Sequence, residues 1–175
     1  MNVDVKGIEK AIQELNGSDK KVQNAVKSAV GRSLTAGRAA ISKGIRSEYS
    51  VKAGTIKSAI LRKRTDGGMS GELRVSGRPL DLMEFSPNIS KSGMVSVRIK
   101  KARKKLPHSF FVSTGKAGLY HRMSKKRLPL SREFTLSVPQ MAGNVNVSNQ
   151  VTERMQKVFE ARLLHALEYG KGKDK

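Results

Sequence analysis

The chain has 175 residues, enough for one domain with a real core, and 37% of them are hydrophobic, with no Trp and few aromatic residues. It contains no cysteine, which excludes disulfides and thiolate metal sites. No apolar stretch is long enough to cross a bilayer, and the N-terminus is not typical of a signal peptide or an anchor, so we expect a soluble protein made inside the cell.

Positive charge is the strongest feature of the chain, and it is concentrated in two blocks. The formal net charge is +21. Residues 20–46 hold seven cations and no acid, and residues 91–127 hold twelve cations and no acid, so these blocks contribute 19 of the 21 net charges. Such a field attracts polyanions and repels other copies of the same chain unless something screens it.

Apolar periodicity predicts that the N-terminal third is helical. We expect a short amphipathic helix at residues 5–15 and a long helix that runs from a cap at Ser18 or Asp19 to about Arg46. Ser50 is expected to cap a shorter helix. The predicted apolar positions of the long helix and of the shorter helix that follows it are Val22, Val26, Ala29, Val30, Leu34, Ile41, Ile45, Ile56, Ala59 and Ile60.

The middle of the chain carries strand signals. Residues 60–65, "ILRKRT", and residues 71–77, "GELRVSG", flank a "DGG" turn, which is typical of a hairpin. A further strand is expected over residues 94–100, and residues 108–113, "HSFFVS", are expected to pair with it across the basic segment. Residues 113–149 are rich in Gly, Ser and Pro, so we expect few regular elements there.

A final amphipathic helix is expected from a cap near Ser148 to Gly170. Arg162 lies inside its apolar stripe. Either the aliphatic stem of Arg162 extends to the edge of the stripe, or this helix faces another subunit, and both interpretations stay open.

These signals predict an α+β fold in a single domain at residues 1–169. A small, mainly antiparallel sheet at residues 61–112 is expected to be packed by the long N-terminal helix and by the C-terminal helix. Residues 170–175 are expected to form a disordered basic tail.

Motifs for nucleotide binding and catalysis fail on spacing. Residues 112–118, "VSTGKAG", lack the earlier glycine of a phosphate loop and place Ala117 where Ser or Thr must hold magnesium. A catalytic interpretation would need His121, Glu133 and a metal in one pocket. We therefore predict that the chain is not an enzyme and holds no cofactor or metal. The histidines, which are scattered and interpreted as surface or hydrogen-bonded residues, are His108, His121 and His165.

The basic segment, residues 98–105, is the remaining candidate site. Six of its eight residues are cationic. A solvated hairpin would explain such a run in isolation, but the acid-free stretch spans 37 residues and a second one lies on the long helix, which favours a contact surface. Cations without interleaved aromatic residues suit non-specific, salt-sensitive phosphate contact. The predicted contact residues are Arg98, Lys100, Lys101, Arg103, Lys104 and Lys105.

Several segments occur in a characteristic order. They are "AVGRSLTAGRAAISKGIRSEY", "YSVKAGTIKSAI", "LRVSGRPLDLMEF", "SFFVSTGKAGLYHR", "RLPLSREF", "SVPQM" and the final amphipathic helix. The ordered set, over about residues 20–168, resembles the prophage minor tail protein Z family, the tail-completion proteins of long-tailed phages. No single segment is diagnostic.

The resemblance implies a structural role in tail completion and head–tail joining at the head-proximal end of the tail, with no catalytic residues. It implies an α+β domain that assembles into a ring, commonly with sixfold symmetry, beside other tail and neck proteins. The location implied is the virion tail, after synthesis in the cytoplasm of a bacterial host.

The resemblance implies one of two positions for the basic segment in the assembled tail. It lines a lumen through which DNA passes, or it docks against an acidic neighbouring ring. The second is favoured, because a strongly attractive lumen would slow DNA ejection. The alternative function is a stand-alone, non-specific nucleic-acid-binding protein, which would bind duplex DNA as a monomer with steep salt dependence.

Overall fold

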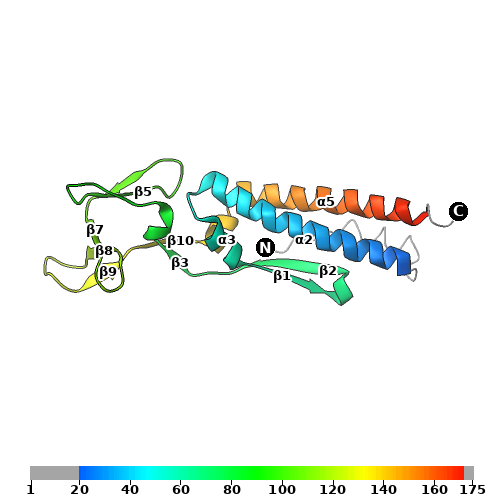
Figure 1. Cartoon of the computed structure of the whole chain (residues 1–175), viewed down its shortest axis with the longest axis horizontal. Coiled ribbons are helices and arrows are strands. Elements are labelled where there is room, and N and C mark those ends of the chain that lie inside the picture. The colour runs from blue at the N-terminus through cyan, green and yellow to red at the C-terminus, as the bar shows by residue number, and fades with distance from the viewer. Residues whose placement is uncertain (1–19, 172–175) are drawn as a thin grey trace.

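The computed structural model describes residues 20–171. They form an elongated molecule with two parts, a helical stem and a β-rich lobe at one end (Figure 1). The stem comprises residues 20–78 and 138–171, and the lobe comprises residues 79–137. The helix predicted at residues 5–15 lies outside the described residues.

Two long helices form the stem. Helix α2 (Lys20–Glu48) and helix α5 (Val145–Lys171) run antiparallel, side by side (Figure 1). They approach closely at Gly37, where a Cβ atom would lie 2.5 Å from Met155 Sδ and 2.7 Å from Leu73 Cδ1. Val22 is half-buried, and the other predicted positions of the α2 stripe are buried: Val26, Ala29, Val30, Leu34, Ile41 and Ile45.

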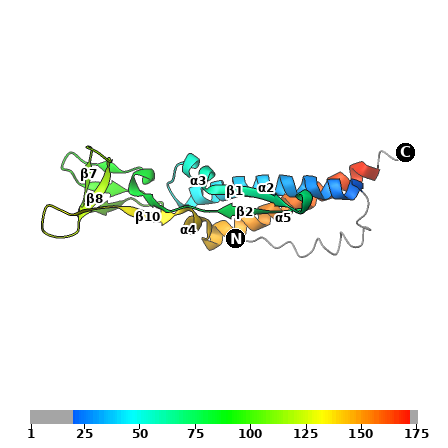
Figure 2. The same ribbon diagram turned by 90° about the horizontal axis from the view of Figure 1, so that it is seen from below.

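The predicted hairpin is confirmed. Strands β1 (Ile60–Thr65) and β2 (Ser70–Val75) pair antiparallel along their full length, and the hairpin lies along the helix pair (Figure 2). The turn between them, Asp66–Gly68, places Gly67 at φ 61°, a left-handed conformation that glycine adopts without steric cost. Leu73 points inward and is buried against α2.

The short helix before the hairpin is α3 (Ala53–Ala59). The expectation that Ser50 caps it is wrong, because Lys52 occupies the N-cap position and makes no side-chain capping bond. The backbone N–H of Ser50 instead donates to a carbonyl of the lobe. Ile60, which was assigned to this helix, is the first residue of β1.

The lobe contains three small antiparallel sheets. One is a two-stranded ribbon that joins the lobe to the stem (Figure 1), and the others have three strands each. The ribbon is β3 (Pro79–Asp81) with β10 (Phe134–Ser137); the other sheets are β4 (Asn88–Ile89), β5 (Val95–Val97) and β6 (Lys104–Leu106), and β7 (Ser109–Val112), β8 (Gly118–Arg122) and β9 (Leu130–Arg132).

The α+β fold class is therefore confirmed, but its β structure is divided among four small sheets. The expected pairing of "HSFFVS" with the preceding strand is wrong. Strand β7 pairs with β8, while β5 pairs with β6, which the basic segment itself provides. A hairpin between neighbouring segments closes a shorter loop and so loses less chain entropy.

Residues 113–149 are more regular than expected. Besides β8, β9 and β10 they contain α4 (Val138–Ala142). Ser137 and Gln140 form a capping box at its start, in which each side chain bonds to the backbone N–H of the other residue. This local chemistry begins a helix inside a segment whose composition suggested a loop.

Helix α5 differs at both ends from its prediction. It begins at Val145, one turn before the expected cap at Ser148, and it continues through Gly170 to Lys171. The rest of the predicted tail, residues 172–175, lies outside the described residues.

Buried side chains are unevenly divided between the two parts. Of the 24 hydrophobic residues that are buried within the described part of the chain, nineteen belong to the stem and five to the lobe. The five in the lobe are Leu82, Phe85, Val95, Val97 and Leu119. They are continuous with the core of the stem, so the lobe is attached to that core at its inner end.

Candidate contact surface

The turn of the basic segment packs against the end of a helix. Residues 98–103 connect β5 to β6, and Ser50, just beyond α2, donates its backbone N–H to Ile99 O at 3.0 Å. The Nζ atom of Lys100 lies 5.9 Å from the ring centroid of Tyr49, a cation–π contact. The basic segment is thus partly held at the junction between lobe and stem.

Negative charge faces this turn from the stem. The C-terminal end of α2 carries the negative pole of its helix dipole, which favours cations within the last turn. Half-buried Glu48 lines the same recess as Arg98, Lys100 and Lys101. This explains in part how the chain tolerates so many like charges between two packed segments.

The predicted contact residues divide by what their side chains do. Arg98 Nε donates to Lys101 O at 3.1 Å, and Arg103 Nη1 donates to the carbonyls of Ser86 and Ser96, both at 3.2 Å. Hydrogen bonds to a charged donor are stronger than neutral ones. The two arginines therefore hold the turn in shape as well as adding charge to it.

Three lysines remain open to a partner. Lys101, Lys104 and Lys105 are exposed, and their side chains make no hydrogen bond or ion pair with any residue in the 20–171 range. Lys104 and Lys105 lie on β6, an edge strand of its sheet. Lysine on an edge strand also prevents pairing with a foreign strand, which is a purely structural use.

Every acid of the lobe is already engaged. Asp81 pairs with Arg132 inside the lobe. Glu84 accepts a hydrogen bond from Thr55 Oγ1 at 2.9 Å and lies 3.9 Å from Lys52 Nζ, both on the stem. Glu133 accepts a hydrogen bond from Ser109 and lies beside His121. Of the thirteen cations in residues 79–137, Arg132 is the one that pairs with a carboxylate of the described chain.

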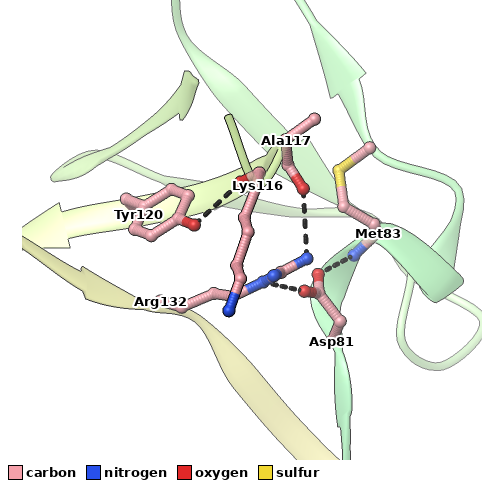
Figure 3. A network of polar contacts seen from close by, with 6 residues as sticks. All are labelled: Asp81, Met83, Lys116, Ala117, Tyr120 and Arg132. Carbon is pink, nitrogen blue, oxygen red and sulfur yellow. Dashed lines mark hydrogen bonds and ion pairs between the residues drawn. The ribbon is translucent and has the colours of Figure 1, made fainter. Parts of the chain in front are cut away.

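The Arg132–Asp81 pair belongs to a network that joins β3, β8 and β9 (Figure 3). Arg132 Nη2 donates to Ala117 O at 3.1 Å, and its guanidinium lies 6.0 Å from the ring centroid of Tyr120. Asp81 Oδ1 accepts from the backbone N–H of Met83 at 2.8 Å. No local pattern predicts this pair, because its partners are 51 residues apart in the chain.

His121 and Glu133, the two residues named in the catalytic interpretation, do come together. His121 Nδ1 is 2.9 Å from Glu133 Oε1, which is close enough for an ion pair when the imidazole is protonated. The Nδ1 atom is buried, and it makes no hydrogen bond with the described residues. Ser109 Oγ donates to the same Oε1 at 2.9 Å. The hydroxyl thus bonds to the carboxylate rather than to the imidazole, and residues 20–171 contain no cluster of three metal-ligating side chains.

The loop between β8 and β9 is an exposed element that was not predicted from the sequence. It projects from the lobe on the side away from the stem (Figures 1 and 2). Met123 and Leu128 are 66% and 65% exposed there, and each directly follows a cation, Arg122 or Arg127. The sequence signal was present in "HRMSKKRLPL", where large apolar residues stand inside a basic run.

Within the described part of the chain, no helix combines the length and apolarity that a membrane span requires. Comparison with protein families, with curated proteins and with solved structures finds no match.

Proposed function

We propose that the chain is a structural minor tail protein of a phage or prophage, acting in tail completion and head–tail joining at the head-proximal end of the tail. The ordered segments that resemble the tail protein Z family support this proposal. So does the basic segment, because Lys101, Lys104 and Lys105 are exposed and unpaired while every acid of the lobe is engaged. The exposed lysines are the observation that carries the proposal.

In this proposal the basic segment docks against an acidic surface of a neighbouring protein. The partners are other tail and neck proteins, together with further copies of the chain in a ring. Complementary charge accelerates encounter and selects the correct partner and register more than it adds affinity. Unpaired lysines on an ordered hairpin suit that task, because they lose little solvation until the partner arrives.

The test is a triple substitution in the phage that carries the gene. Lys101→Gln, Lys104→Gln and Lys105→Gln together remove three charges from the basic segment. The matched control removes three exposed charges from the stem: Lys43→Gln, Lys57→Gln and Lys157→Gln.

We expect the basic-segment variant to reduce the yield of joined, infectious particles about tenfold or more, because complementary charge steers the encounter and register of the partners. Free heads and tails should accumulate in electron micrographs, and the stem variant should assemble normally. Full joining by the basic-segment variant would contradict the proposal.

A stand-alone, non-specific nucleic-acid-binding protein is the second candidate, favoured by the twelve cations and the lack of acids in residues 91–127. The isolated monomer would then bind duplex DNA at physiological salt, with affinity falling steeply as salt rises. The proposed tail protein should show little such affinity. Titration of labelled duplex at several salt concentrations separates the two functions.

A further inference from the structure

A recess of about 180 Å³ lies where the lobe meets the stem. Its stem side is the last turn of α2, with Arg46 and Glu48, and its lobe side is the turn of the basic segment, with Arg98, Lys100 and Lys101. The recess admits one small charged group, and its volume is below the ~300 Å³ typical of sites for larger organic ligands.

The charges around this recess do not balance. Four cationic residues line it and Glu48 is its only acid, so the lining carries a formal charge of +3, which the negative pole of α2 reduces by only about half a charge. The cations come from both parts of the molecule, with Arg46 on the stem and the other three on the lobe. Like charges brought together across a junction repel one another, and an anion between them would relieve that repulsion.

We propose that the recess receives the carboxylate of an Asp or Glu side chain from an acidic partner protein. This inference rests on the proposed function and names the contact by which that partner is held. Guanidinium groups donate paired hydrogen bonds that match a carboxylate, and Arg46 and Arg98 both line the recess. Arg98 uses its Nε on Lys101 O, and its terminal nitrogens make no hydrogen bond with the described residues.

The shape of the site favours a protein side chain over DNA. Duplex phosphates are spaced along a rod and are neutralised by an extended cationic surface. Here four cationic residues line one recess between two parts of the molecule, which suits a single protruding group.

Occupation of the recess should also tighten the junction. The hydrogen bond from Ser50 N–H to Ile99 O, 3.0 Å long, crosses from stem to lobe beside the recess. A carboxylate that contacts Arg46 on one side and Lys101 on the other would hold the two parts together. Exchange of the Ser50 amide should therefore slow when the site is filled, an effect that diffuse charge attraction does not predict.

The experiment uses the full chain and hexaglutamate as the probe, with binding followed by calorimetry and amide exchange by NMR at low salt. Arg46→Gln and Lys101→Gln should each weaken binding about five- to tenfold and, at the probe concentration that half-saturates the parent protein, remove most of the added protection of the Ser50 amide. Lys43→Gln on α2 and Lys91→Gln on the lobe remove the same charge outside the recess, and they should stay within about twofold of the parent protein. All four side chains are exposed, so these variants should fold.

Equal weakening of hexaglutamate binding by all four substitutions would overturn the proposed site, because binding would then depend on the net charge of the protein alone. Lack of hexaglutamate binding would overturn it as well. Tighter binding of a short DNA duplex, with the same dependence on Arg46 and Lys101, would overturn the choice of a carboxylate. These measurements use the isolated protein, so their failure is distinguishable from failure of the proposed function, which is scored by particle joining.

Discussion

The stem and the lobe are stabilised in different ways. Among the described residues, the stem buries nineteen hydrophobic side chains on its helices, its hairpin and the segments that connect them, whereas the 59-residue lobe buries five. A unit of that size with so small a core is marginal without further support. The lobe gains that support from short hairpins, from its polar networks and from attachment to the core of the stem.

The two parts also use charge differently. The described stem has eighteen cations and six acids, and the lobe has thirteen and three. In the lobe the acids are engaged in contacts that hold strands and helices in place, which leaves most of the cations without a carboxylate partner. The lobe is therefore the part whose surface cations need an acidic partner from outside the described chain.

The largest expected effect is that of a substitution in the core of the lobe. Phe85 is fully buried, so Phe85→Ala should lower the free energy of unfolding of the lobe by about 3–5 kcal/mol. Trypsin should then cut the lobe at denaturant concentrations at which circular dichroism still reports the stem helices. Phe111→Ala, at a side chain that is 37% exposed, is the control and should cost much less. A single transition for both parts would show that lobe and stem unfold as one unit.

Next in size is a substitution at the contact between α2 and its neighbours. Gly37→Ala places a methyl group against Met155 and Leu73, and we expect a loss of about 1–3 kcal/mol in the free energy of unfolding of the stem. Gly54→Ala in α3 is the matched control, because a methyl group there meets no atom within 4 Å. Denaturant titrations of the two variants measure the difference, and equal stability would argue against the close approach at Gly37.

A smaller effect is expected for the polar network of the lobe. The side chains of Arg132 and Asp81 are 31% and 16% exposed, so solvent weakens the pair, and Arg132→Gln should cost about 1–2 kcal/mol. Arg127→Gln removes an exposed cation from the nearby loop and should have little effect. A double-mutant cycle with Asp81→Asn isolates the coupling of the pair, and a coupling near zero would remove its stabilising role.

The smallest effect on stability is expected for the lysines of the basic segment. Neutralising Lys101, Lys104 and Lys105 should change the free energy of unfolding by no more than about 0.5 kcal/mol, since all three are exposed and unpaired. The denaturation midpoint of the purified triple variant measures this. A large loss would assign the lysines a structural task in the lobe.

Much of the fold followed from patterns within short segments. The long helix, the C-terminal helix and the hairpin of β1 and β2 were predicted from apolar periodicity and a glycine turn, and all three are present. The errors concern neighbours and also some element types. The partner of β7 and the strands within residues 113–149 depend on which segments meet, and local periodicity carries no information on that. The starts of α3 and α5 were misplaced by a few residues, and Ile60 belongs to a strand rather than to a helix.

For the candidate site, the residue composition alone establishes the amount of positive charge and its two acid-free blocks. The folded chain sets how those charges are used, including the pairing of Lys104 and Lys105 with β5. It placed Lys100 over Tyr49, bonded Arg103 to Ser86 and gathered charges from both parts around one recess. The physical reason is that charge is a property of each residue alone, whereas compensation of charge depends on which distant residues the folded chain brings within a few ångströms.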